Sequence, residues 1–377
     1  MENIKAWADE VFDKIEKKLS RTAPAVGDTM FPYTTENGRF VNPYNDDWWT
    51  NGFWIGILWK MYLATDNEMY RKYAEKLEEK LDKVIEEFIF LNHDVGFMWL
   101  LSSVINHRIT GDETAARRGL HMATVLAGRF NIAGNFIRAW NCAPDAEEHN
   151  AGWVIIDSMM NIPLLYWASR ETNDPRFYNT ATAHADTLLK HAIRPDGSVK
   201  HIMVFDPETG EYIKNITGQS YDVDGAWSRG QAWAIYGFTL SYIHTGKIEY
   251  LDAAKRIAHY FISALPEDNI PPCDFRSPKE PVYKDTTAGA CAACGLIELS
   301  KVVPEGESDV YLNAAIKMLR AMEETCCDWS DSEDSILGMG TEAYHHGMKN
   351  VPIIYGDYFF IEAIMKLRGD KKDMLFW

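Results

Sequence analysis

Hydrophobic and polar residues alternate along this chain in two kinds of segment. Segments of the first kind place apolar residues at helical spacing on one face and charged residues on the other, which predicts amphipathic helices. Segments of the second kind are rich in glycine, small residues and aromatics with few charges, which predicts helices buried on all sides. The amphipathic segments are 1–19, 67–88, 112–130, 174–193, 248–265 and 308–325. The buried segments are 50–64, 94–107, 151–169, 224–244, 285–303 and 355–367.

Similar turns join the two kinds of segment, which indicates a repeat. Thr65, Thr110, Thr172 and Thr245 lie in the stretches ATDN, ITGD, ETND and HTGK. Each repeat is one helical hairpin, and the hairpins together predict an all-α fold, an (α/α)6 toroid with six inner and six outer helices. We expect one domain over residues 1–377, with few short strands in loops, among them a hairpin at 197–213.

In such a toroid the inner helices all begin at one mouth. Aromatic, acidic and basic residues gather at these positions, and their shared location favours a functional site. Asp before a helix is also a routine N-cap, so a structural role stays open for each acid taken alone. The residues are Trp49, His93, Asp94, Trp140, Asp224, Trp227, Arg229, Asp285 and Asp357.

Asp157 lies in the middle of the apolar segment NAGWVIIDSMMNIPLLYWAS, which predicts a buried helix over 150–169. An isolated carboxylate is costly there, so this one is paired, protonated or functional. Its neighbours Ile155, Ile156, Met159 and Met160 predict a desolvated carboxyl with a raised pKa. A buried, hydrogen-bonded structural acid is the alternative.

Charge and composition narrow the choice of partner. The chain is 46% hydrophobic and its net charge of −17 argues against nucleic acid and anionic membranes. Thirteen Trp suit a cleft for sugars or other flat ligands, although most of them are expected in the core. The first residues lack the apolar region of a signal peptide, so we expect a cytoplasmic protein.

The cysteines and histidines suggest no metal or cofactor site. Cys291 and Cys294 have redox or metal spacing but stand alone among small apolar residues, so buried structural thiols are expected. His345 and His346 are expected at the surface. No phosphate loop, metal cluster or nucleotide fingerprint occurs in the sequence, and we predict no cofactor and no metal.

Six segments, in order over nearly the whole chain, carry specific motifs. They are WTNGFWIGILW (49–59), NHDVGF (92–97), GWVIIDSMMNIPLL (152–165), HIMVFDP (201–207), DGAWSRGQAWAIYGF (224–238) and YGDYFFIEA (355–363). Together they resemble glycoside hydrolase family 88, the unsaturated glucuronyl hydrolases. The stretch around Asp157 and the stretch WSRGQAW are the most specific.

The resemblance implies an (α/α)6 barrel with two essential aspartates, which fall on Asp94 and Asp157. It implies an enzyme that removes a 4,5-unsaturated uronic acid from the non-reducing end of lyase-generated oligosaccharides, such as those from glycosaminoglycans. The partner is then a small acidic unsaturated oligosaccharide. The implied substrate-contacting residues are Trp49, His93, Trp140, His201, Gln219, Arg229 and Trp233.

Two places depart from the family pattern. Asn51 stands where the family often has Asp. The segment 343–358 is shorter than its counterparts, which in some members hold a sulfate on the next sugar. Lys349 is the candidate for that role here.

The implied reaction is hydration of an enol ether, with a proton added at C4 and water at C5. It needs a carboxyl that is protonated beforehand, which fits Asp157 as general acid and then base. Asp94 precedes a helix, where backbone N–H groups favour the anion, so we expect it to stay ionised.

The remaining site residues divide into polar contacts and walls. Arg229, Gln219 and His201 are the candidates for the carboxylate and hydroxyls, while Trp49, Trp140 and Trp233 are expected to form apolar walls. The structural alternative for Arg229 is a salt bridge to Asp224 or Asp222.

Three other functions stay open. An unsaturated rhamnogalacturonyl or galacturonyl hydrolase shares the fold, although His93 with Asp94 and the Arg229–Gln231 stretch favour the glucuronyl type. A sugar epimerase needs two histidine acid/base groups, and the segment bearing Asp157 has none. An oligosaccharide-binding protein explains the Trp residues but not the aspartates. In solution we expect a monomer or weak homo-oligomer.

Overall fold

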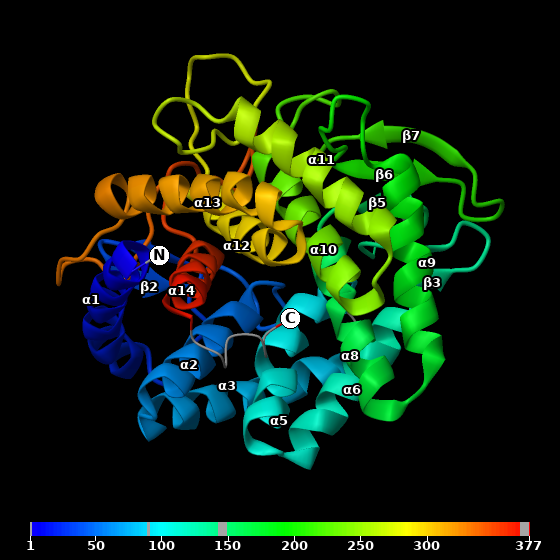
Figure 1. Ribbon diagram of the computed structural model, residues 1–377. Helices are drawn as coiled ribbons and strands as arrows, with labels where there is room; N and C mark the ends of the chain where they lie inside the picture. The colour runs from blue at the N-terminus through cyan, green and yellow to red at the C-terminus, as the bar shows by residue number, and fades with distance from the viewer. Residues whose placement is uncertain (1, 89–90, 142–148, 370–376) are drawn as a thin grey trace.

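Six helical segments form the inner layer of a closed ring in the computed structural model, which describes residues 2–88, 91–141, 149–369 and 377 (Figure 1). Each inner segment contacts the next, and the last contacts the first. The inner segments are α2 (Asn51–Thr65), α4 with η1 and α5 (Val95–Trp99, Leu100–Val104, Ile105–Thr110), α7 with α8 (Ser158–Asn161, Pro163–Thr172), α10 (Ser228–Thr245), α12 (Thr286–Val302) and α14 (Ile354–Arg368).

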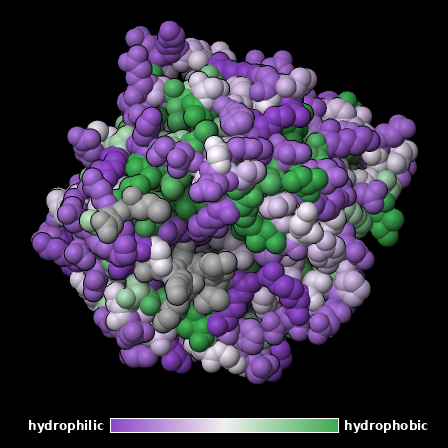
Figure 2. All heavy atoms as spheres, in the orientation of Figure 1, coloured by the Kyte–Doolittle hydropathy of each residue, from purple (hydrophilic) through white to green (hydrophobic). Residues whose placement is uncertain are grey.

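Six amphipathic helices form the outer layer, so the predicted (α/α)6 toroid is confirmed. Each outer helix buries one face against the inner ring and exposes the other. Polar residues accordingly cover most of the surface seen in Figure 2. No helix in the described ranges is long and apolar enough to cross a membrane. The outer helices are α1 (Glu2–Val26), α3 (Glu68–Glu87), α6 (Glu113–Gly128), α9 (Pro175–His191), α11 (Ile248–Ala264) and α13 (Glu305–Thr325).

The threonine turns form the same hydrogen-bonded unit at four hairpins. Each threonine hydroxyl donates to the carbonyl four residues earlier and accepts the backbone N–H two residues later, at 3.1–3.3 Å. At three of these turns Asn67, Asp112 or Asp174 then caps the outer helix by accepting an N–H. The turn therefore ends one helix and starts the next with local bonds alone. The four threonines are Thr65, Thr110, Thr172 and Thr245.

Short strands lie in the loops between the helices, as expected. The hairpin predicted at 197–213 is confirmed, and it forms the pair β6–β7. A third strand, β5, pairs with β6 in antiparallel fashion and was not foreseen. The strands of the described chain are β1 (Thr34–Glu36), β2 (Arg39–Val41), β3 (Phe130–Asn131), β4 (Phe136–Ile137), β5 (Trp153–Ile155), β6 (Ile202–Phe205) and β7 (Tyr212–Ile216).

The segment 150–169 is not the single buried helix that its apolar pattern predicts. It begins as strand β5, turns at Asp157, and only then continues as α7 and α8. Two features explain the difference. The run from Val154 to Ile156 is β-branched and suits a strand, and Pro163 starts a new helix at its first position. Asp157 therefore precedes a helix.

The cysteines behave as structural thiols. Cys291 and Cys294 are buried in α12, and burial raises the pKa of both thiols far above the usual range. All five cysteines in the described part of the chain are free, while Cys142 lies outside the described residues.

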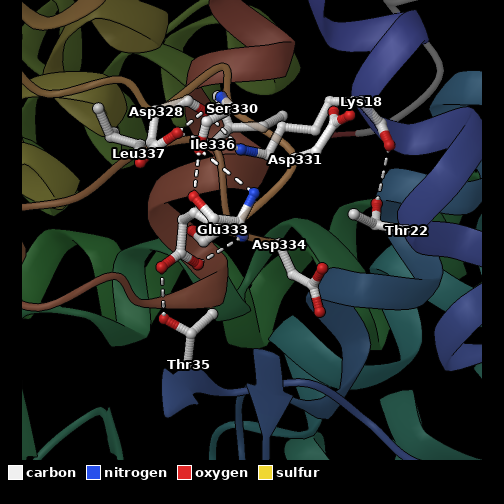
Figure 3. Close-up of polar contacts among 12 residues, drawn as sticks. Lys18, Thr22, Thr35, Asp328, Ser330, Asp331, Glu333, Asp334, Ile336 and Leu337 are labelled. Atoms are coloured by element: carbon white, nitrogen blue, oxygen red, sulfur yellow. Dashed lines mark hydrogen bonds and ion pairs between the residues drawn. The ribbon is translucent and has the colours of Figure 1, made fainter. Parts of the chain in front are cut away.

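The loop between α13 and α14 closes the ring onto α1. Lys18 of α1 donates to the backbone carbonyl of Asp328, and the hydroxyl of Thr35 donates to Glu333 at 3.2 Å (Figure 3). Arg21 pairs with Asp331 in the same loop. In Figure 1 helix α1, in blue, lies beside α14, in red, which it contacts. These contacts join the first helix of the chain to its last helical hairpin.

Gly52→Ala tests the contact between neighbouring inner helices. A Cβ added at Gly52 of α2 would lie 2.5 Å from the carbonyl oxygen of Phe97 and 2.7 Å from Cα of Met98. Because these are backbone atoms that cannot rotate away, we expect the free energy of unfolding to fall by about 1–3 kcal/mol in urea denaturation. Gly306→Ala in α13 is the control, since its added Cβ meets nothing within 4 Å. Equal losses in both variants would contradict the prediction.

Candidate active site

A cavity of about 540 Å³ lies where the inner helices begin. Seven of the nine residues predicted for the site line it, and His93 and His201 lie directly behind the lining. The predicted residues in the lining are Trp49, Asp94, Trp140, Asp157, Gln219, Arg229 and Trp233; the others are Asp47, Trp48, Asn92, Asn141, Gly218, Trp227 and His346.

Several lining residues were not expected there. Trp48 stacks on Tyr44, with ring centroids 4.0 Å apart and planes 11° apart. The doubled tryptophan at 48–49 was the sequence signal for it. His346 is exposed, as expected, but it also lines the cavity. Asn92 begins the motif NHDVGF but was not expected to contact the substrate, and no pattern in the sequence pointed to Asn141.

Of three acids expected near the mouth, two have structural partners. Asp285 pairs with Arg229, and Asp357 accepts the backbone N–H groups of Ile336 and Leu337. Asp224 is exposed. None of the three lines the cavity among the described residues.

Asp94 is buried beside the cavity, with 5% of its surface exposed. Its Oδ1 accepts a hydrogen bond from Nδ2 of Asn161 at 3.2 Å, and its side chain caps no N–H of α4. The prediction that helix N–H groups keep it ionised is therefore wrong. Burial raises the pKa of Asp94, while the Asn161 amide and the charge of Arg129 oppose that rise.

Asp157 precedes α7 and keeps 17% of its side chain exposed. Its neighbours Ile155, Ile156, Met159 and Met160 are fully buried, and its Oδ1 has no hydrogen-bond partner in the described chain. Burial raises the pKa of Asp157 well above its usual range, and the nearby charge of Asp94 raises it further. The direction of the shift agrees with the raised pKa expected from the apolar neighbours, while the role of Asp157 as a protonated acid stays a prediction.

His93 stands between the two acids. Its Nε2 lies 3.5 Å from Oδ1 of Asp94 and 3.7 Å from Oδ1 of Asp157. The ring is fully buried, and burial lowers its pKa well below the usual range, so the imidazole is neutral. The three side chains offer one ligand atom each within 4.8 Å of one another. Because burial favours a neutral carboxyl at Asp157, which binds cations poorly, the absence of a metal stays our prediction.

Arg229 is buried in the first turn of α10, where its guanidinium lies between two rings. The ring centroids of Trp227 and Tyr355 are 4.7 and 5.3 Å away. Nη1 donates to Asp285 at 2.5 Å. The salt bridge suggested to Asp224 or Asp222 is therefore wrong, because the partner comes from the beginning of α12.

The other bonds of Arg229 leave part of its fork free. Nη1 also donates to the carbonyl of Thr341, and Nη2 donates to that of Glu342. Within the described residues Nε makes no hydrogen bond. The Nε–H and one N–H of Nη2 are thus available to a planar carboxylate.

His201 and the tryptophans complete the walls. Nδ1 of His201 accepts the backbone N–H of Gly218 at 3.2 Å, so any proton on the neutral ring is on Nε2. Burial lowers the pKa of His201 to about 3. Its ring lies 4.3 Å from Trp227, and Trp49 and Trp233 both pack against Phe97. Aromatic rings and the two acids therefore line the same cavity.

The chain is similar to known proteins over nearly its whole length. It is 35% identical to the unsaturated glucuronyl hydrolase of Bacillus sp. (strain GL1), over 92% of this chain and 93% of that protein. It is 34% identical to the unsaturated chondroitin disaccharide hydrolase of Streptococcus pneumoniae, over 100% of this chain and 94% of that one.

A solved structure agrees with these relatives. The crystal structure of unsaturated glucuronyl hydrolase from Streptococcus agalactiae superposes with a TM-score of 0.91 at 32% identity, covering 99% of this chain and 94% of that chain. The model of Glycosyl Hydrolase Family 88 matches residues 23–268. The chain therefore belongs to glycoside hydrolase family 88, the unsaturated glucuronyl hydrolases.

Proposed function

We propose that this enzyme releases the 4,5-unsaturated uronic acid from the non-reducing end of lyase-generated oligosaccharides. One observation carries the proposal: a carboxyl kept neutral by burial, Asp157, faces the same aromatic cavity as Asp94. The names of the relatives, which include a glucuronyl and a chondroitin disaccharide hydrolase, favour this substrate over rhamnogalacturonides.

The reaction begins with the proton on Asp157. The electron pair of the C4–C5 double bond takes this proton at C4, and the positive charge at C5 is shared with the ring oxygen. Water then bonds to C5 and gives its proton to the carboxylate of Asp157, which acts as base. The hemiketal opens to a ketone at C5, and the hemiacetal formed at C1 expels the next sugar. Asp94 assists as the ionised partner of the pair.

The other site residues bind the substrate in this proposal. The free edge of the Arg229 fork meets the carboxylate, and Gln219 and His201 meet carboxylate or hydroxyl oxygens. Trp49, Trp140 and Trp233 hold the faces of the sugar ring, and His93 lies between the acids. Asn51, buried at the start of α2, donates to the carbonyls of Asn45 and Asp46 and thereby shapes the loop before Trp49.

We propose that the sugar released from the uronic acid carries no sulfate. Lys349, the candidate to bind a sulfate, has its Nζ 5.3 Å from the ring centroid of Tyr283. It is absent from the residues that line the cavity in the described chain. The segment 343–358 contributes His346 to the lining instead, and Asp47 also lines the cavity. An acidic residue in the lining disfavours a sulfate near it.

Other properties stay predictions. We expect one catalytic domain over 1–377, a cytoplasmic location, a monomer or weak homo-oligomer, no cofactor or metal, and no binding to nucleic acid. A sugar epimerase is disfavoured, because among the described residues His93 is the one histidine paired with the two acids. An oligosaccharide-binding protein would not need a desolvated acid in its cavity.

Asp157→Asn tests the general acid. The amide has the same shape but no proton to give to C4, so we expect turnover of an unsaturated disaccharide to fall about 10²–10⁴-fold. Loss of the substrate's ultraviolet absorbance measures the rate. Asp357→Asn, at a buried acid outside the cavity, is the control that should keep turnover. A folded Asp157→Asn variant with near-normal activity would make this residue structural.

Arg229→Lys tests the carboxylate clamp. Lysine keeps a positive charge near Asp285 but lacks the planar fork, so we expect kcat/KM to fall about 10–100-fold, mainly through KM. Binding of the free acid and of its methyl ester should be compared on the unmodified enzyme. Equal affinity for the two ligands would show that no clamp exists.

Heavy water tests the type of reaction. Because the carboxyl proton of Asp157 exchanges with solvent, product formed early in deuterium oxide should carry deuterium at C4. A saturated glucuronide has no double bond to protonate and should not be cleaved. An ordinary glycosidase acts at the anomeric carbon and would leave C4 unlabelled. Unlabelled early product, or cleavage of the saturated sugar, would exclude hydration.

A further inference from the structure

We propose that Asn161 is a positioning residue that decides which of the two aspartates carries the proton. Its amide donates a hydrogen bond to Asp94, which stays a carboxylate, and the proton is left on Asp157. The inference rests on the proposed function for its catalytic meaning. It rests on hydrogen-bond geometry for the placement of the proton. Asn161 was not among the residues expected in the site.

The orientation of the Asn161 amide is fixed by the backbone. Its side chain is fully buried at the end of α7, and its Oδ1 accepts the N–H of Phe97 at 2.8 Å. Because an N–H group needs an oxygen acceptor, the amide cannot be turned round. Nδ2 therefore faces the acids, 3.2 Å from Oδ1 of Asp94 and 3.5 Å from the carbonyl oxygen of Asp157. One side chain thus links the two acid-bearing turns.

The position of Asn161 is fixed as firmly as its orientation. A Cβ added at Gly96 of α4 would lie 2.4 Å from Cα of Asn161. Helices α4 and α7 therefore meet backbone to backbone at this point. The amide has no room to slide along the acids.

The fixed amide of Asn161 gives the two carboxyls different affinities for a proton. Its N–H can only donate, so Oδ1 of Asp94 must accept, and the amide stabilises the charged form of Asp94. Oδ1 of Asp157 receives no hydrogen bond from the described chain. The backbone N–H of Ser158 and the charge of Arg229 also act on the Asp157 carboxyl, but they leave this Oδ1 without a donor. With one proton between two close carboxyls, the proton belongs on the acid that keeps an oxygen without a donor and that lines the cavity.

Other charged groups around the pair do not replace this bond. Arg129 lies behind Asp94, but its guanidinium donates to the carbonyls of Arg138 and Ala139. Arg229 is held by Asp285, and His93 is neutral. Asn161 is the one side chain of the described chain that donates a hydrogen bond to Asp94.

Asn161→Ala tests the assignment directly. The pKa of Asp94 should be followed by carbon-13 NMR of labelled aspartate carboxyls, with Asp94→Asn used to identify the signal. Removing the donor takes stabilisation from the carboxylate, so we expect the pKa of Asp94 to rise by about one unit. This readout needs no substrate. An unchanged pKa would overturn the proposal.

The same variant should change the kinetics in a matching way. In a plot of kcat/KM against pH, activity falls on the acidic side where Asp94 takes up a proton. This acidic limb should move to higher pH by about one unit. Asn106→Ala is the matched control, because Nδ2 of Asn106 donates at 3.0 Å to the buried acid Glu78 away from the cavity. It should destabilise the fold but leave the limb unmoved. A shift of the limb in both variants would mean that lost stability, and not the donor, is the cause.

Asn161→Asp covers the case in which alanine prevents folding. The aspartate keeps an oxygen for the N–H of Phe97 but replaces the donor to Asp94 by a third carboxyl. We expect kcat/KM near neutral pH to fall about 100-fold or more. Unchanged activity would overturn the proposal. The two proposals can fail separately. If the unmodified enzyme is inactive on unsaturated disaccharides, the proposed function is refuted. If the pKa of Asp94 nevertheless rises in Asn161→Ala, the placement of the proton on Asp157 still holds.

Discussion

Helix α4 is held between α2 and α7 by contacts of backbone with backbone, and the active site depends on them. At Gly52 and Gly96 no side chain separates the neighbouring helices. The turns that precede α4 and α7 are therefore brought together, and with them Asp94 and Asp157. Side chains can repack around a substitution, whereas touching main chains cannot. The spacing of the two acids is thus a property of the ring rather than of any flexible loop.

The cavity resolves an electrostatic conflict, because it must hold an anionic sugar although acids line it. Burial favours the neutral form of Asp157 and of His93, so that of these three groups only Asp94 adds a negative charge, which reduces the repulsion. The charge of Arg229 is largely offset by Asp285. Recognition then relies on directed N–H groups in an aromatic pocket rather than on excess positive charge. Such contacts depend on geometry and are little affected by salt.

The fold was predictable because each hairpin is specified locally, by apolar periodicity and by turns such as that of Thr110. Long-range features were not predictable. A short apolar run does not distinguish strand from helix, and β5 exists because β6 pairs with it. The partner of Arg229 lies 56 residues away, and the donor to Asp94 lies 67 residues away. The raised pKa of Asp157 was predicted correctly because its apolar neighbours are adjacent in sequence.

The bond from Lys18 to the carbonyl of Asp328 spans 310 residues and has a consequence for how the chain matures. The hairpins can form in order during synthesis, since their turns need only neighbouring residues. The cavity cannot form in this stepwise way, because its lining residues extend along the chain from Asp47 to His346. Binding of substrate therefore waits until the end of the chain has been made and docked. A nascent or shortened chain is helical but has no complete pocket, and ligand binding reports completion of the ring.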